Sequence, residues 1–266
     1  MHGHPASPFH RSRPAWGWAL AGLLLGGVAS ALLCAPAVWV ERAVNAQGAG
    51  YVRLDDSRGT LWNGSAQFTL AGGAGSTDAV RLPGRVYWAL RPGLGEIHVA
   101  VNAPCCTTQP VVLHMAPGWR NWALRVDAAR TVWPAALLAG LGTPWNTLQL
   151  DGRVALDTPG LTVRTALDRW TLDGSLQLEA RAISARVSTL RPLGSYRLDV
   201  VGGAQTQVTL STLQGALQLS GQGQWTAGRL HFQGRASASA PHEAELSNLL
   251  NILGRRNGAQ SLITVG

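Results

Sequence analysis

Apolar and polar residues alternate along most of the chain after residue 50. Residues 97–101 and 122–126, for example, place an apolar side chain at every second position, with polar or small residues between them. Because successive side chains of a β-strand point to opposite faces, this period of two gives each strand one apolar and one polar face. The pattern predicts half-buried antiparallel strands, and it places Trp88 and Trp122 in the core.

Glycine and other turn residues divide the alternating segments into short strands. Asn63-Gly64 is a typical hairpin turn. Residues 148–156, 172–178 and 213–221 each hold a glycine between apolar positions, which indicates a bend, a bulge or a tight hairpin. No fixed repeat length relates these segments, so a solenoid is not predicted. Short strands spaced in this way are typical of an all-β antiparallel assembly.

Two short segments have helical spacing instead. Residues 134–140 begin with proline and end with glycine, an arrangement typical of a short helix. Residues 241–253 carry glutamates in the first turn and leucines at i, i+3, i+4 and i+7, and Gly254 follows. This helix either docks on a partner or packs on its own sheet, and packing is the stronger interpretation. Its apolar face consists of Leu246, Leu249, Leu250 and Leu253.

The N-terminal region has a different pattern, because residues 15–40 contain no charged side chain. A helix of this length exceeds the roughly 20 apolar residues that are needed to cross a bilayer. Trp16 and Trp18 lie at one end of the run and Trp39 lies at the other. Interfacial tryptophans anchor membrane helices at such positions. We therefore predict a transmembrane helix with these three tryptophans as its membrane anchors.

The residues that precede the apolar run set its orientation. Arg11 and Arg13 lie before it without any acidic residue, and basic residues beside a membrane helix favour the cytoplasmic side. We predict a cytoplasmic tail over residues 1–14, the transmembrane helix over residues 15–40, a polar linker over residues 41–50 and an exported β-rich domain over residues 51–266.

A cleaved signal peptide is the alternative interpretation of the same run. The small-residue triplets at 29–31 and 35–37 both resemble cleavage sites. The uncleaved anchor is favoured because the run is longer than the usual signal-peptide core of about 7–15 residues, and because Trp39 lies beyond both sites. A third interpretation, a lipoprotein modified at Cys34, has still less support, because Leu33 occupies a position where a small residue is expected. In each case the rest of the chain is exported.

Composition excludes several classes of protein. Of the 266 residues, 46% are hydrophobic and 14% are charged, which is the opposite of the signature of intrinsic disorder. All 22 basic residues are arginine and 14 residues are acidic, so the net charge is +8. The arginines are spread thinly along the chain, whereas a nucleic-acid-binding face concentrates basic residues on one helix or stripe. We therefore predict no nucleic-acid partner.

The chain shows no sequence pattern of catalytic or metal-binding residues. His98, His114, His231 and His242 have no second histidine three or four residues away, so a zinc site is not predicted. The absence of lysine excludes a P-loop and a Ser-x-x-Lys motif, and no Gly-x-Ser-x-Gly elbow occurs. We predict that the chain is not an enzyme and that it has no catalytic residue, no metal and no cofactor.

Two of the three cysteines, Cys105 and Cys106, are adjacent in the sequence. A bond between neighbouring cysteines closes a strained ring and stabilises a fold little. No further ligands with metal-site spacing accompany them. Two interpretations stay open, a pair of small loop residues and a vicinal disulfide in an oxidising compartment.

Three stretches of sequence carry a resemblance to a known family. They are residues 58–66 (RGTLWNGSA), residues 82–90 (LPGRVYWAL) and residues 249–258 (LLNILGRRNG), the last followed by the ending SLITVG. Together with the N-terminal anchor, and in the same order along the chain, they resemble type II secretion system protein N. Each stretch is a turn-and-strand pattern, and none is a catalytic signature.

The resemblance implies an inner-membrane component of the machine that moves folded proteins from the periplasm across the outer membrane. The N-terminus would be cytoplasmic and residues 51–266 periplasmic. The family is similar to AsmA-like β-rich membrane proteins, which are associated with lipid transport or outer-membrane biogenesis. We therefore expect a mainly β fold, with an N-terminal transmembrane helix followed by a curved antiparallel, half-barrel-like sheet and two short helices.

We expect an accessory component of the type II (general) secretion pathway whose partners are other secretion proteins, which an edge-rich sheet contacts. The alternative is a lipid-binding or lipid-transport module in which the inner apolar face holds acyl chains. Helices that seal this face would disfavour lipid, and an open groove would favour it. The residues expected on the face are Leu148, Leu150, Val154, Leu156, Leu176, Leu178, Leu217 and Leu219.

Overall fold

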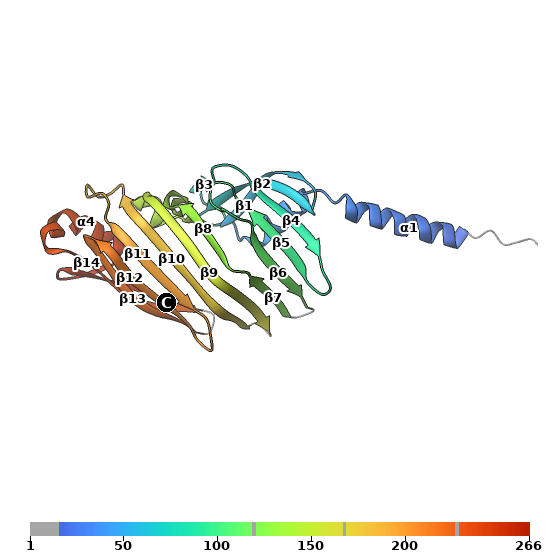
Figure 1. Ribbon diagram of the computed structural model, residues 1–266. Helices are drawn as coiled ribbons and strands as arrows, with labels where there is room; N and C mark the ends of the chain where they lie inside the picture. Colours follow the sequence, from blue (N-terminus) through green and yellow to red (C-terminus); the bar gives the residue numbers. More distant parts are fainter. Residues whose placement is uncertain (1–15, 119–120, 167–168, 227–228) are drawn as a thin grey trace, which may run out of the picture. The chain divides into compact units, whose positions relative to one another are not determined.

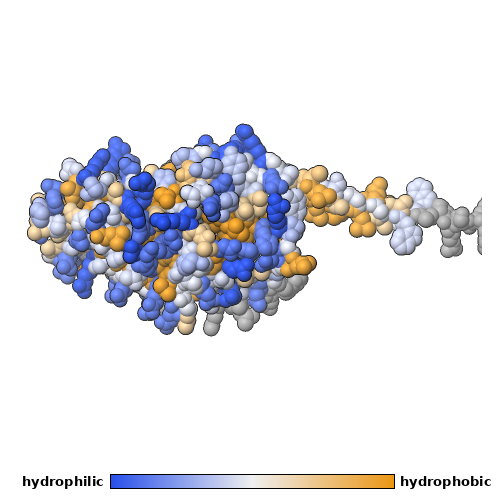
Figure 2. Space-filling view, viewed as in Figure 1, coloured by the Kyte–Doolittle hydropathy of each residue, from blue (hydrophilic) through white to orange (hydrophobic). Residues whose placement is uncertain are grey.

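The computed structural model describes residues 16–118, 121–166, 169–226 and 229–266 (Figure 1). The chain divides into two units, Met1–Ala35 and Pro36–Gly266. The described part of the first unit is essentially one helix, α1 (Trp16–Leu33), which consists of apolar and small residues and buries none of them (Figure 2). Among the described residues it is the one helix that is long and apolar enough to cross a membrane. The predicted tail, residues 1–14, lies outside the described residues.

The predicted helix over residues 15–40 and the predicted linker over residues 41–50 do not have these bounds. α1 ends at Leu33, and a second helix, α2 (Val38–Gln47), begins shortly after Pro36. Proline has no backbone N–H and disfavours the helical conformation in the residue before it, which explains the interruption. Most of the predicted linker is therefore helix, and it belongs to the second unit.

α2 forms because it has an apolar side to bury. Val40 and Val44 lie one turn apart on the helix and pack against a small core of the second unit. A spacing of four residues between apolar positions is typical of a helix. The prediction of a polar linker over residues 41–50 does not take this spacing into account. The core that they cover consists of Ala37, Leu54, Ala66 and Trp88.

The second unit is built on one antiparallel sheet that is curved and does not close (Figure 1). The strand order is β1-β2-β4-β5-β6-β7-β9-β10-β11-β12-β13-β14-β16-β15, with β3 paired to β2 and β8 paired to β9. The predicted mainly β fold is confirmed. The strands are β1 (Val52–Gly59), β2 (Asn63–Ala71), β3 (Ala79–Arg81), β4 (Val86–Pro92), β5 (Ile97–Asn102), β6 (Val111–Pro117), β7 (Asn121–Val126), β8 (Ala129–Pro134), β9 (Leu150–Ala166), β10 (Arg169–Ala185), β11 (Gly194–Val201), β12 (Thr206–Gly215), β13 (Leu217–Thr226), β14 (Arg229–Ala238), β15 (Arg255–Asn257) and β16 (Gln260–Val265).

The strand register places the alternating apolar residues on one face of the sheet. Val99 pairs with Leu113, and Leu113 pairs with Val126 on the next strand. Farther along the sheet, Leu178 pairs with Leu198. Directly opposed residues share a face, so the apolar positions line up across many strands. The period of two therefore predicts this face correctly.

The turn predicted at Asn63-Gly64 needs correction. Asn63 and Gly64 both belong to β2, and the chain turns at residues 60–62, where the Thr60 N–H donates to the Asn63 carbonyl. Gly64 serves packing, because a Cβ at this position would collide with the Trp88 ring. Residues 150–156 and 172–178 belong to the 17-residue strands β9 and β10, so their glycines do not mark hairpins. The register between the two strands shifts beside Gly152 and after Ser175, which agrees with the predicted bend or bulge.

The largest core lies under the C-terminal helix. The short helices are η1 (Ala135–Leu141), α3 (Trp145–Leu148), η2 (Ala240–His242) and α4 (Glu243–Leu253), and η1 and α4 occupy the two segments predicted to be helical. α4 buries three leucines almost completely, and burial of one such side chain contributes about 1.5–3 kcal/mol. The buried residues of this core are Ala135, Leu148, Ile183, Ala185, Leu193, Tyr196, Leu217, Ala236, Leu246, Leu249 and Leu250.

Candidate functional surface

The central strands of the sheet carry apolar side chains that stay partly exposed. Met115 on β6, Trp122 on β7 and Trp170 on β10 are 42%, 46% and 37% exposed. The pairs Trp122–Thr165 and Thr165–Trp170 run across β7, β9 and β10 and place both rings on the apolar face. We call Met115, Trp122 and Trp170 the central apolar surface. Trp88 is buried as predicted, but the prediction that Trp122 is a core residue is wrong.

A pair of tryptophans shows how the sheet curves around this face. The ring centroids of Trp170 on β10 and Trp225 on β13 are 4.7 Å apart, with the ring planes at 67°. Strands β11 and β12 lie between them in the sheet order. In a flat sheet β10 and β13 would be about 14 Å apart. The two side chains meet across the apolar face, in the edge-to-face geometry that aromatic pairs favour.

The residues expected to hold acyl chains fall into two groups. Leu148 and Leu217 are buried, and Leu150, Val154 and Leu219 pack against the same core as the α4 leucines. Helices therefore seal this part of the apolar face. The other three, Leu156, Leu176 and Leu178, are partly exposed.

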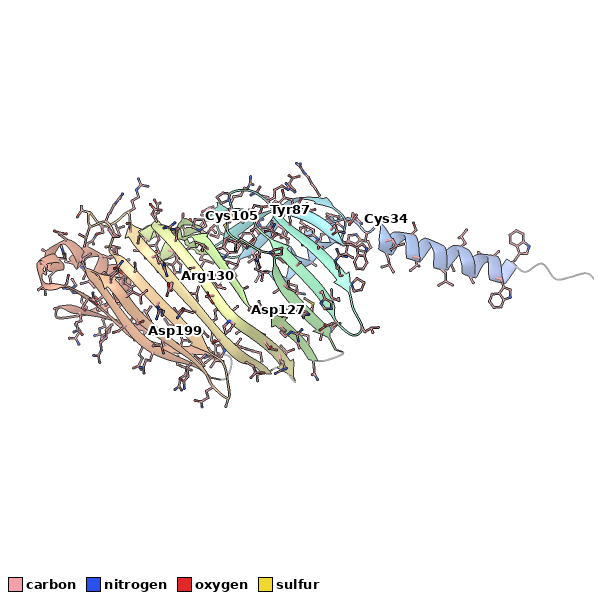
Figure 3. All side chains as sticks on the ribbon, in the orientation of Figure 1. Cys34, Tyr87, Cys105, Asp127, Arg130 and Asp199 are labelled. Carbon is pink, nitrogen blue, oxygen red and sulfur yellow. A yellow bond between two sulfur atoms is a disulfide. The ribbon has the colours of Figure 1, made fainter. Side chains whose placement is uncertain are left out.

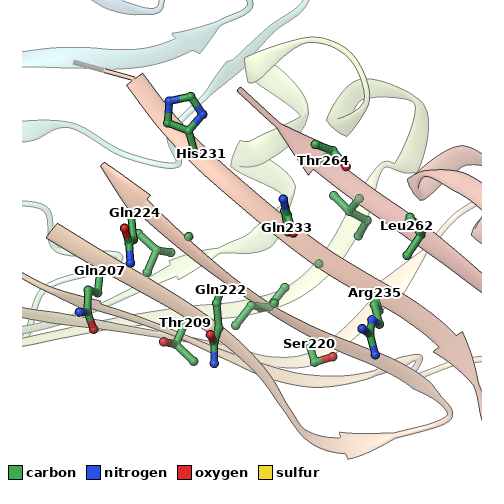
Figure 4. Close-up of a pocket in the computed structure, with 16 residues that line it drawn as sticks. Gln207, Thr209, Ser220, Gln222, Gln224, His231, Gln233, Arg235, Leu262 and Thr264 are labelled. Atoms are coloured by element: carbon green, nitrogen blue, oxygen red, sulfur yellow. The ribbon is translucent and has the colours of Figure 1, made fainter. Parts of the chain in front are cut away.

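The opposite face holds a polar groove of about 1240 Å³ at β12, β13, β14 and β16 (Figure 4). Its side chains form rows across the strands, because Thr209 pairs with Gln222, Gln222 with Gln233, and Gln233 with Thr264. Neutral amides and hydroxyls dominate the groove, so its surface donates and accepts hydrogen bonds and has little charge. The labelled residues in Figure 4 are Gln207, Thr209, Ser220, Gln222, Gln224, His231, Gln233, Arg235, Leu262 and Thr264.

The outer edge of β1 is occupied by side chains of α2. The Asn45 side chain accepts a hydrogen bond from the Leu54 N–H at 2.8 Å and donates one to the Leu54 carbonyl at 3.0 Å. The Ser57 N–H donates to the Glu41 carboxylate at 3.1 Å. These bonds satisfy backbone groups that another strand would otherwise contact. Together with the bulge between Asp55 and Arg58, they block this edge.

A charged cluster reinforces the same edge. Asp56 has a left-handed backbone (φ +51°), and its carboxylate forms ion pairs with Arg85 at 2.7 Å and with Arg58 at 2.9 Å. The hydrogen bonds from Arg85 and then Arg58 hold the pKa of Asp56 below its ordinary value. Charge and a local twist both disfavour the approach of a further strand.

The other end of the sheet is less protected. β15 pairs with β16 at Gln260, Ser261 and Leu262 and extends no farther. Beyond it, residues 263–265 pair with β14 on one side, and within the described residues no strand pairs with their other side. Thr264 and Val265 are exposed there. An unpaired edge of this kind can accept an extended segment from another protein.

A histidine cluster lies on the polar face of the β5–β6 hairpin, and sequence analysis missed it. His98 and His114 are register partners, and their ring centroids are 4.6 Å apart. Glu96 approaches both rings, and the Nε2 of His114 lies 2.9 Å from the Asp127 carboxylate. Neither histidine has a second one three or four residues away in the sequence, which is why no zinc site is predicted there. Strand pairing joins them, and spacing along the chain carries no signal of it.

Cys105 and Cys106 are bonded to each other in the turn after β5, which selects the disulfide from the two interpretations left open (Figure 3). Cys106 is buried beside Leu82, Ala103 and Leu137. A small hollow of about 230 Å³ lies at this turn, and Arg130 is among the residues that line it. Its size admits a few water molecules or a small group.

The remaining predicted site residues fall into three places. Trp16 and Trp18 are exposed on α1, in agreement with their expected position at the start of the apolar helix. Trp39 is half-exposed on α2 and so does not mark the far end of α1. The α4 leucines at 246, 249 and 250 are buried and Leu253 packs against their core, so α4 packs on its own sheet.

Comparison with known protein families identifies a match over most of the chain. The family model described as type II secretion system (T2SS), protein N matches residues 50–263. This range includes every strand of the described residues except the last two residues of β16. No curated protein and no solved structure matches the chain.

Proposed function

Because the chain belongs to the type II secretion system protein N family, we propose that it is an accessory inner-membrane component of the type II secretion pathway. In this role it supports the export of folded proteins across the outer membrane through contacts with other periplasmic components. The family match over residues 50–263 is the observation that carries the proposal. The sheet is the part of the chain that makes these contacts.

The proposed topology is a single crossing of the inner membrane by α1. Its apolar composition and lack of buried residues support this arrangement. Arg11 and Arg13 support a cytoplasmic N-terminus, with the second unit in the periplasm. The bond between Cys105 and Cys106 suits an oxidising compartment.

The proposed contact is strand addition at the free edge of β16. An extended segment of a secretion protein pairs with residues 263–265 through backbone hydrogen bonds, and side chains beside the edge supply specificity. Tethering by α1 raises the effective concentration of this edge near the inner-membrane part of the machine. The role needs no catalytic residue, metal or cofactor, and we propose that the protein is not an enzyme.

Secretion in a deletion strain tests this function. We expect loss of the gene to lower the amount of secreted protein outside the cell, with substrate retained in the periplasm, and the full chain to restore it. A fusion of a periplasm-dependent reporter to the C-terminus tests the topology in the same strain. Normal secretion without the protein would contradict the accessory role, and an inactive reporter on a stable fusion would contradict the orientation.

A lipid-binding function is the second candidate, and the central apolar surface favours it. Met115, Trp122 and Trp170 leave apolar area exposed near one end of the central strands β6, β7 and β10, where acyl chains would lie along the tryptophan rings. The part sealed by α4 is unsuitable, so bound lipid is confined to the central strands. Native mass spectrometry of the full chain tests it. We expect co-purified phospholipid that Trp122→Ser reduces and Trp39→Ser does not, and equal lipid in both variants would contradict this function.

A further inference from the structure

The cluster at the start of the β5–β6 hairpin has the spacing of a metal site. The Oε1 atom of Glu96 lies 3.2 Å from Nε2 of His98 and 3.5 Å from Nδ1 of His114, and the three atoms all lie within 4.8 Å of one another. Two ligands bound to a tetrahedral zinc at about 2.0–2.2 Å are roughly 3.3–3.6 Å apart. We propose that Glu96, His98 and His114 bind one zinc-class divalent cation.

Asp127 orients the His114 ring and fixes which ring nitrogen is free to bind a metal ion. The Nε2 atom of His114 lies 2.9 Å from Oδ2 of Asp127 (Figure 3 labels Asp127). An ionised carboxylate accepts hydrogen bonds and donates none, so Nε2 carries the proton. In the neutral ring this leaves the lone pair on Nδ1, the atom that faces Glu96. A carboxylate on the second nitrogen is the usual support of a metal-binding histidine.

The unpaired Nδ1 of His114 is the second observation that points to a ligand. This atom is buried and has no hydrogen-bond partner. Its lone pair and the Glu96 carboxylate face each other as two acceptors, which is unfavourable unless a positive charge lies between them. A cation bound to both atoms supplies that charge. A proton on Nδ1 is the competing occupant, and the experiment below distinguishes the two.

The hairpin holds the ligands in place without a loop rearrangement. His98 and His114 face each other directly in the register of β5 and β6. Glu96 lies in the preceding turn, where its carbonyl accepts the Gly93 N–H at 2.8 Å. His114 is 12% exposed and His98 is 40% exposed, so solvent reaches the open side of the cluster. Three protein ligands leave the fourth position to water.

Neighbouring charges limit the affinity. Arg91 is the register partner of His98, and Arg125 is the register partner of His114. Both arginines disfavour a nearby cation. The Nε atom of Arg125 lies 3.7 Å from Oδ1 of Asp127, so its charge is partly balanced by that carboxylate. Glu96 and Asp127 together match the charge of a divalent ion.

Titration of the full chain with zinc chloride tests the site. The protein is purified in detergent without a histidine tag and stripped with a chelator. His2, His4 and His10 are replaced by alanine in the starting protein, so that these tail histidines do not compete with the cluster for zinc. Calorimetry should find one zinc ion per chain. Magnesium and calcium should not compete, because both ions prefer oxygen ligands.

Single substitutions assign the ligands. We expect His98→Ala and His114→Ala each to weaken zinc binding at least tenfold, and Asp127→Asn to weaken it about 10–100-fold through the loss of orientation. His231→Ala, which changes an exposed histidine outside the cluster, should leave the affinity unchanged. Circular dichroism of each variant confirms that the sheet is intact. Cobalt should give the visible absorption of a four-coordinate site in the starting protein and not in H114A.

Two results would overturn the proposal. One is the absence of a zinc-binding event in the folded starting protein. The other is one-to-one binding that His98→Ala and His114→Ala both leave unchanged while the variants stay folded. In either case the cluster is a network of ion pairs and hydrogen bonds and not a metal site.

Discussion

The two ends of the sheet differ in how their outermost strands are protected. At the β1 end, Asn45 and Glu41 of α2 hydrogen-bond to the outward backbone groups of Leu54 and Ser57. At the β16 end, β15 stops at its pairing with Leu262, and within the described part of the chain residues 263–265 have no partner on their outer side. Unpaired edges favour pairing with other chains, and proteins commonly block them. The difference supports the assignment of partner contact to β16.

The largest expected effect concerns the support of the open end. Leu249→Ala removes a fully buried side chain between α4 and the sheet and should lower the free energy of unfolding by about 2–5 kcal/mol. Denaturant unfolding of the full chain in detergent measures this change. Asn251→Ala on the exposed side of the same helix should change it by less than about 0.5 kcal/mol. Equal losses in the two variants would contradict the packing of α4.

Opening the blocked end should have the next largest effect. Asn45→Ala leaves the Leu54 N–H and carbonyl without their side-chain partner, and we expect a loss of about 1–3 kcal/mol. Hydrogen exchange should also become faster at the Leu54 amide. The matched control is Gln47→Ala, which alters an exposed residue of the same helix. Unchanged exchange at Leu54 would show that α2 does not block this edge.

Acid should weaken the charged cluster at the blocked end by a smaller amount. Arg85 and Arg58 lower the pKa of Asp56, so the ionised carboxylate stabilises the fold at pH values above its unfolded-state pKa. That contribution is lost as the pH falls through the folded-state pKa. The unchanged protein should therefore lose more stability between pH 7 and about pH 3 than Asp56→Asn does. Urea midpoints at the two pH values measure this, and equal losses would contradict it.

The smallest effect on stability is expected at the open edge. Thr264→Lys adds a charge to an exposed residue of β16 and should change the free energy of unfolding by less than about 0.5 kcal/mol. Secretion should nevertheless fall, because lysine on an edge strand disfavours pairing. The matched variant Arg53→Lys on β1 should secrete normally. A normal secretion level in both variants would contradict the proposal that a partner pairs with the edge of β16.

The alternation of residues predicts the sheet because a strand obeys a local rule. Residues such as Val99 and Leu113 have the period that one face of a sheet requires, and the structure pairs them. The leucines of α4 are predictable for the same reason. The predicted burial of Trp122 is wrong. Burial depends on which elements cover a face of the sheet, and the alternation of residues does not show this.

The histidine cluster and the two edges could not be predicted from the sequence in this way. His98 and His114 meet through strand register, which involves residues far apart in the chain. The blocking of β1 depends on α2, a short helix that begins shortly after Pro36 and packs Val40 and Val44 against the core. In both cases the important contact joins two separate elements, and the local pattern of apolar and polar residues does not indicate it.

Paired photo-crosslinking in secreting cells directly tests whether a secretion protein contacts the open edge of β16 and not the blocked edge of β1. One photoreactive residue replaces Thr264 at the open edge, and another replaces Arg53 at the blocked edge, each in the full chain. We predict a crosslink to a type II secretion component from position 264 and a much weaker one from position 53. Secretion that depends on the protein, with no crosslink to any secretion component from position 264, would contradict it.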